Sequence, residues 1–157
     1  MAKETAGTLA LKKAGITFTP YPYEYDPNAD KIGIQAANAL GKAPEQVFKT
    51  LMCEVDKAPA CVIIPSDCEV SMKKLAAAFG GKSANMMKPD AAERMTGFKV
   101  GGISPFGQRK QVKTFIDETA ILFDEVLING GARGLLVGVI PNDVIEILRF
   151  GLIDLVA

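Results

Sequence analysis

The stretch "VKTFIDETAILFDEVLINGGARGLLVGVI", Val112–Ile140, holds three apolar runs in close succession, and these runs decide the fold class. The runs are VKTFID (112–117), EVLING (125–130) and LLVGVI (135–140), and their length and β-branched residues predict three strands. Consecutive strands without a helix between them favour antiparallel pairing, whereas strict alternation with helices would favour a parallel sheet. The stretch therefore predicts an α+β protein.

Upstream of this stretch, helices and strands follow one another in no regular order. Apolar runs at 47–55 and 60–65 predict two further strands, and 16–25 predicts an extended edge segment because it contains two prolines. Caps and apolar spacing predict helices at 5–14, 34–40, 72–79, 88–95 and 142–149. These elements together predict a mixed sheet covered by helices.

The size and composition are those of one ordinary globular domain, residues 1–157, with 48% hydrophobic and 23% charged residues. A chain of this length buries about two-thirds of its unfolded surface. No apolar run approaches the roughly 18 residues that span a bilayer, and the N-terminus lacks the apolar stretch of a signal peptide. We therefore expect a cytoplasmic protein without membrane contact.

The chain has no histidine and three cysteines, Cys53, Cys61 and Cys68. The absence of histidine excludes mixed Cys/His zinc sites and Cys–His or Ser–His catalysis. The cysteines lack the close pairing of metal or redox motifs, so buried, inert thiols are favoured over a thiol-redox protein. We expect no metal and no cofactor.

Charges are balanced: Lys plus Arg and Asp plus Glu each number 18, so the formal net charge is zero. Proteins that hold a long nucleic acid alone usually show a strong basic excess. If nucleic acid is the substrate, we expect the protein to hold a small part of it, with a partner supplying the remaining contacts.

The strand predicted at 47–55, "VFKTLMCEV", is apolar on both faces and carries Lys49 near its start. Burying a neutral polar group without a partner costs about 2–7 kcal/mol, and burying an unpaired ammonium costs more. Either the Lys49 side chain extends along the strand until its amine reaches water, or it faces a pocket that takes an anionic ligand.

Two glycine-rich segments, "VGGISPFG" (100–107) and "NGGARG" (129–134), have too little side chain to shield their peptide groups. A hairpin turn explains either one. The alternative is a site in which backbone N–H groups hold a carbonyl, an oxyanion or a phosphate, with Arg133 clamping a phosphate. Neither segment matches a Walker loop or a GxGxxG fingerprint.

Three motifs occur together, in order, in one known family. "FKTL" (48–51), "TGFKVGGISPFGQRK" (96–110) and "INGGARGL" (128–135) closely resemble the YbaK-like trans-editing proteins, relatives of the prolyl-tRNA synthetase editing domain. The resemblance covers essentially the whole chain. It implies a mixed, largely antiparallel sheet curled into a partial barrel, with a pocket for an aminoacylated tRNA 3′ end.

The resemblance also implies an activity and a partner. It implies a deacylase that clears mischarged tRNA, in the closest case cysteine from tRNA(Pro) and otherwise alanine or another small residue. For a cysteinyl ester, the substrate's own thiolate attacks the carbonyl, so the protein needs no nucleophile. Prolyl-tRNA synthetase is implied as a transient partner.

By the same resemblance, the catalytic residues are Lys49, Gly101 and Gly102, with the lysine near the phosphate of the terminal nucleotide. The resemblance implies substrate contacts from Tyr23, Ile32, Thr50, Ile103, Ser104, Pro105, Asn129, Gly130, Arg133 and Leu136.

The chain departs from the family at three of these positions. Ile32 stands where an aromatic residue is common, Asn129 where serine is common, and Leu136 where some members have an acidic residue. One methylene in an apolar pocket is worth about 1–3 kcal/mol, so such changes can redirect the choice of amino acid. They also leave open a non-catalytic module that binds a tRNA 3′ end, a nucleotide or a regulatory protein.

Overall fold

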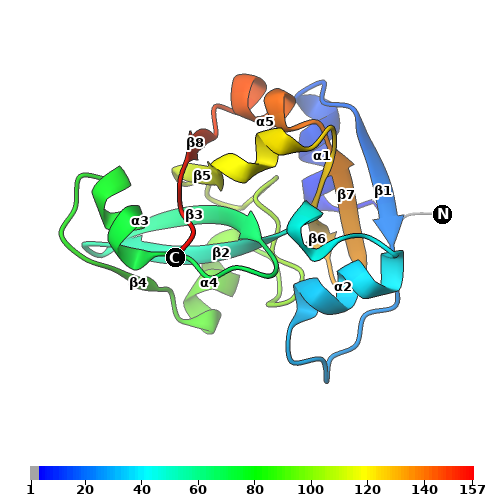
Figure 1. The fold of residues 1–157 in the computed structure, drawn as a ribbon, viewed down its shortest axis with the longest axis horizontal. Coiled ribbons are helices and arrows are strands. Elements are labelled where there is room, and N and C mark those ends of the chain that lie inside the picture. Colours follow the sequence, from blue (N-terminus) through cyan, green and yellow to red (C-terminus); the bar gives the residue numbers. More distant parts are fainter. Residues whose placement is uncertain (1–3) are drawn as a thin grey trace.

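An eight-stranded sheet forms the framework of the molecule (Figure 1). The structure is a computed structural model that describes residues 4–157. Its strands are β1 (Phe18–Pro22), β2 (Val47–Val55), β3 (Ala58–Pro65), β4 (Ala84–Met86), β5 (Thr114–Asp117), β6 (Val126–Ala132), β7 (Leu135–Val139) and β8 (Gly151–Ile153). The order along the sheet is β1-β7-β6-β2-β3-β5-β8, and β4 pairs with β2.

In the described residues, 4–157, five α-helices and two 3₁₀ turns accompany this sheet. They are α1 (Ala6–Lys13), α2 (Ile32–Leu40), η1 (Pro44–Gln46), α3 (Met72–Ala78), α4 (Pro89–Thr96), η2 (Glu118–Leu122) and α5 (Pro141–Ile147). In Figure 1, α5 lies at the top of the molecule and α2 and α4 lie at the bottom. Within residues 4–157, none of the helices combines the length and the apolarity needed to cross a membrane.

Local sequence signals set the helix ends, with small shifts from the prediction. Thr5 caps α1 in a capping box with Thr8, and Gly41 ends α2 with a φ of 67°. The last helix begins at Pro141, one residue before the prediction, because proline fits the first helical position. It ends before Arg149, whose φ of 63° lies outside the helical region.

The predicted α+β fold, with a mixed and largely antiparallel sheet curled into a partial barrel, is confirmed. Strand pairs are antiparallel for β1–β7, β2–β3, β2–β4 and β6–β7, and parallel for β2–β6, β3–β5 and β5–β8. The expectation that the strands of Val112–Ile140 pair consecutively is wrong for β5. Because η2 leads the chain away after Asp117, β5 lies between β3 and β8.

Strand β2 is buried on both faces, as its apolar pattern predicts. Phe48 packs in the barrel interior, whereas Cys53 packs on the opposite face beneath α3. Val47, at the start of the strand, packs against α2, and Met52, beyond its middle, packs against α4. Four separate clusters thus meet on this strand, and its middle lies between them.

Candidate functional site

A cavity of about 300 Å³ opens beside the middle of β2. Its walls come from α2, from β4 and the start of α4, and from the first glycine-rich segment. The lining is mostly apolar: Ile32, Ala36, Val47, Leu51, Met52, Met86, Met87, Ala92, Val100, Ile103 and Leu136. A cavity of this size and composition suits a small ligand held by a few polar groups.

The cavity lies against a stretch of β2 that no strand within residues 4–157 covers on this edge. On this edge β6 pairs with Val47 and Phe48, and β4 pairs from Cys53 onward. The Met52 carbonyl accepts a hydrogen bond from Met87 N at 3.0 Å, so even-numbered residues direct their peptide groups to this edge. Thr50, two residues earlier, therefore directs its peptide group towards the cavity.

Thr50 contributes a second polar group there. Among the described residues, its buried hydroxyl oxygen has no hydrogen-bond partner. A buried polar atom without a partner is destabilising unless a ligand or water satisfies it. The Thr50 hydroxyl is thus a candidate contact for a bound molecule.

Lys49 borders the same cavity and keeps 25% of its side chain exposed. Its amine lies 3.9 Å from the Glu69 carboxylate, which is 76% exposed. Such an open pair contributes little to stability, about 0–1 kcal/mol. Another anion can therefore displace Glu69 from the amine at little cost.

The first glycine-rich segment forms the opposite wall through Gly101 and Ile103. Gly102 is buried, and its N–H donates to the Lys99 carbonyl at 2.8 Å. The Gly102 amide is therefore engaged within the loop, unlike the exposed donor that the sequence suggests. The N–H groups of Gly101 and Ile103, two residues that line the cavity, have no acceptor among residues 4–157, so they are the candidate donors to a ligand.

The two glycine-rich segments pack directly on each other. Asn129 Nδ2 donates to the Gly101 carbonyl at 3.3 Å, and Arg133 Nε donates to the Val100 carbonyl at 2.9 Å. A Cβ atom on Gly102 would lie 2.7 Å from Arg133 N. A glycine is therefore needed at position 102 so that the backbones of the two segments can touch, whether or not a ligand binds beside them.

The structure brings eight of the predicted site residues to the cavity. They are Tyr23, Ile32, Lys49, Thr50, Gly101, Ile103, Asn129 and Leu136. Lys49 is far from Gly101 and Ile103 in sequence, but the three residues line one space.

The other five predicted residues lie outside the lining. Gly102 is buried between the loops, and the Ser104 hydroxyl accepts from Phe106 N at 3.1 Å. Pro105 borders a second cavity, of about 410 Å³, between α1 and the end of α5. The Gly130 carbonyl accepts a hydrogen bond from the Thr5 hydroxyl, and the Arg133 guanidinium lies over the Tyr25 ring, 5.3 Å from its centroid.

Several residues in and beside the cavity wall were not predicted from the sequence. Met86 ends β4, Met87 follows it and Ala92 lies on α4, and the position of all three depends on β4 pairing with the end of β2. Tyr25 lies against Gly101, since a Cβ there would be 2.5 Å from the Tyr25 hydroxyl oxygen. The spacing of "YPYEY" was a usable signal, because alternate tyrosines of an extended segment point to the same side.

The cysteines have thiols that stay protonated near neutral pH. Burial raises the pKa of Cys53 to about 11 and that of Cys61 to about 12. Burial and the nearby Asp67 carboxylate also raise the pKa of Cys68. Thiolate chemistry by the protein itself is thus disfavoured.

We expect iodoacetamide at pH 8 to leave Cys53 and Cys61 of the native protein unmodified, with slow reaction at the half-buried Cys68. The reason is that only the thiolate reacts, and burial suppresses it. Peptide mass mapping measures the modification, and protein in urea, in which all three should react, is the control. Rapid native modification of Cys61 would contradict the assignment.

The sequence of the chain is similar to one family model and to several named proteins. The aminoacyl-tRNA editing domain model matches residues 26–147. An Enterococcus faecalis protein named "Putative Cys-tRNA(Pro)/Cys-tRNA(Cys) deacylase EbsC" is 32% identical over 131 residues, covering 82% of this chain and 80% of that protein. A proline–tRNA ligase of Geobacter metallireducens is 29% identical over 96 residues, or 61% of this chain and 16% of the ligase.

The similarity in fold extends over the whole chain. A solved structure described as "a putative trans-editing enzyme for prolyl tRNA synthetase" aligns with a TM-score of 0.82 at 20% identity, covering 99% of both chains. At this level of identity the match establishes the fold alone.

Proposed function

Because this chain belongs to the aminoacyl-tRNA editing domain family, we propose that it deacylates mischarged tRNA in trans, with cysteine on tRNA(Pro) as the preferred substrate. Alanine or another small residue is the second choice of amino acid. The observation that carries the proposal is that Lys49, Gly101 and Ile103 border one apolar cavity, and that the N–H groups of the two loop residues have no acceptor among residues 4–157. In this proposal the ammonium and the two amides act on one bound molecule, an ester that carries a phosphate nearby.

In this proposal, Lys49 binds the phosphate of the terminal nucleotide and so places the ester in the cavity. The N–H groups of Gly101 and Ile103 donate to the ester carbonyl oxygen as negative charge develops on it. Positioning and such preorganised donors can each supply several kcal/mol, about 3–4 for one oxyanion donor. An aminoacyl ester is already activated, so no histidine base is required.

For a cysteinyl ester, the substrate supplies the nucleophile. Its thiolate attacks its own carbonyl carbon, a C–S bond forms, and the ester C–O bond breaks. The products are a cyclic thioester of cysteine and a deacylated tRNA, whose departing 3′-oxygen takes up the proton that the substrate thiol lost. The protonated state of Cys53 and Cys61 supports a reaction in which no protein thiol takes part.

The remaining lining residues are assigned to recognition of the amino acid. Tyr23, Ile32 and Leu136 form an apolar wall, and the Thr50 hydroxyl, unpaired among the described residues, is available to a polar atom of the substrate. Asn129 is assigned to holding the Gly101 carbonyl, rather than to direct contact with the substrate. An apolar wall suits a small, uncharged side chain.

The partner proposed is prolyl-tRNA synthetase, in transient contact. Support comes from the match to part of a proline–tRNA ligase and from the zero net charge, which leaves little general attraction for tRNA. Arg133, exposed beside the cavity, is the residue assigned to a tRNA phosphate.

The test is a deacylation panel. Cys-tRNA(Pro), Ala-tRNA(Pro) and correctly charged Pro-tRNA(Pro) are incubated with the protein, with and without prolyl-tRNA synthetase, and the remaining acyl label is counted. We expect cysteine to be released fastest, proline to be retained, and the synthetase to raise the rate at low tRNA concentration. Saturable tRNA binding without loss of any label would instead support a non-catalytic binding module.

A further inference from the structure

The segment between β3 and α3 carries the carboxylate that meets Lys49. Glu69 Oε1 lies 3.9 Å from Lys49 Nζ, and within residues 4–157 Lys49 forms no other ion pair. Because Glu69 is mostly exposed, its side chain alone could adopt many positions in water. Its position depends on how the backbone of this segment is held.

The end of the chain holds that backbone by pairing with it. Ala157 N donates to the Glu69 carbonyl at 2.9 Å, and Ser71 N donates to the Leu155 carbonyl at 2.7 Å. Between these two bonds, Val70 forms an antiparallel bridge with Val156. The segment at 69–71 thus behaves as a short strand paired with the C-terminus.

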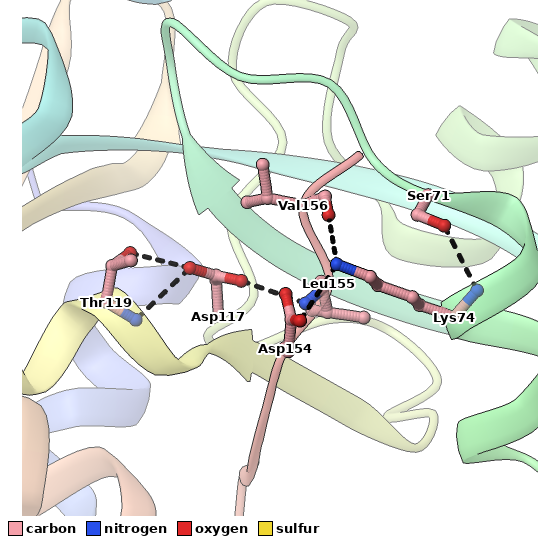
Figure 2. Close-up of polar contacts among 7 residues, drawn as sticks. All are labelled: Ser71, Lys74, Asp117, Thr119, Asp154, Leu155 and Val156. Atoms are coloured by element: carbon pink, nitrogen blue, oxygen red, sulfur yellow. Dashed lines mark hydrogen bonds and ion pairs between the residues drawn. The ribbon is translucent and has the colours of Figure 1, made fainter.

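A buried carboxylate fixes the C-terminus to the sheet (Figure 2). Asp117, only 1% exposed, accepts a hydrogen bond from Leu155 N at 2.9 Å through one oxygen. Its other oxygen accepts from Thr119 N at 3.1 Å and from the Thr119 hydroxyl at 2.6 Å. Breaking such a buried network costs more than breaking an exposed contact.

Lys74 makes the second attachment, from α3. As Figure 2 shows, its amine reaches the C-terminal segment, donating to the Asp154 carboxylate at 2.8 Å and to the Val156 carbonyl at 2.6 Å. We call residues 154–157, together with Asp117 and Lys74, the C-terminal clasp. The clasp joins β5, α3 and the segment that bears Glu69.

We propose that Glu69 is the resting counter-ion of Lys49, and that the C-terminal clasp holds it within reach. The inference rests on the proposed function, because the anion that displaces Glu69 is then a phosphate of the tRNA 3′ end. While Glu69 is in place, it cancels part of the attraction of the ammonium and repels an approaching phosphate. Glu69 is a positioning residue that sets phosphate affinity without touching the reacting atoms.

The test uses adenosine 5′-monophosphate as the probe and calorimetry at low salt as the measurement, so no turnover is needed. We expect Glu69→Gln to tighten binding about two- to fivefold, the range of exposed ion pairs. Binding of adenosine, which lacks the phosphate, should not change. Glu146→Gln, which removes an exposed charge from α5, is the matched control and should have no effect.

Two further arms decide the assignment. In a Lys49→Met background, Glu69→Gln should give no gain, because the ammonium that both anions share is gone. Lys74→Met should shift the affinity for the probe in the same direction as Glu69→Gln, whereas Lys73→Met, on the exposed side of the same helix, should not. Thermal unfolding checks that each variant is folded.

Three results would overturn the inference: no tightening in Glu69→Gln, an equal gain for adenosine, or a gain that persists without Lys49. A wild-type protein that does not bind adenosine 5′-monophosphate would also overturn it, even if the deacylation panel succeeds. Conversely, a failed panel with the expected probe affinities would contradict the proposed function and leave the counter-ion assignment intact.

Discussion

Replacing Lys49 with methionine is expected to lower kcat/KM for deacylation by about 10²- to 10³-fold, as for the loss of one preorganised charge contact in a site. Methionine keeps much of the length and the apolar stem of the side chain, so the packing of this half-buried position is largely retained. The loss should therefore come from the ammonium alone. The measurement is the release of label from the best substrate of the panel.

Stability separates this expectation from a general structural effect. The pair with Glu69 is exposed, so the free energy of unfolding should change by less than about 1 kcal/mol. Lys110→Met, on the exposed segment before β5, is the matched control and should keep the wild-type rate. A Lys49→Met protein that is folded and retains more than a third of the rate would remove Lys49 from the proposed site.

Replacing Gly102 with alanine is the second change with a large expected effect. The added Cβ would lie 2.7 Å from Arg133 N and 2.9 Å from the Ala132 carbonyl carbon, and backbone atoms cannot move aside as a flexible side chain can. The two glycine-rich segments must then separate, at a cost of about 1–3 kcal/mol. Because Gly101 and Ile103 flank the substituted residue, their N–H groups would shift as well.

We expect kcat/KM to fall about 10²-fold, since a displacement of about 1 Å in a positioned site can cost that much. Urea unfolding measures the stability loss. Gly15→Ala is the control: its φ is 75°, but a Cβ there would meet no atom of the described part of the chain within 4 Å. It should lose about 1–2 kcal/mol from backbone strain yet keep full activity. Full activity in Gly102→Ala would show that this junction does not shape the site.

The fold class was predictable because local signals agreed with one another. The two-faced apolar pattern of β2 identified a strand buried on both sides, and the prolines of β1 identified an edge. Which strands pair with each other was harder to predict from the sequence. The position of β5 between β3 and β8 depends on pairings with residues 53 positions earlier and 36 positions later, which no local pattern encodes.

The same holds for the candidate site: individual residues could be predicted, but their arrangement could not. Lys49 was conspicuous because a charge stood on an apolar strand, and the glycine-rich segments were conspicuous by composition. The position at which they come together could not be predicted from the sequence, because it lies where β6 and β4 leave part of β2 uncovered. The engagement of the Gly102 amide with Lys99 is likewise a property of the folded loop.

The uncovered part of β2 has a consequence for solubility. Exposed strand edges recruit strands from other molecules and so promote aggregation. Here the bare interval is only the few residues between Phe48 and Met52, with β6 at one end and β4 at the other. A strand from another molecule could form too few backbone hydrogen bonds at this edge to pair stably. The protein can therefore leave peptide groups open to a ligand here without promoting aggregation through this edge.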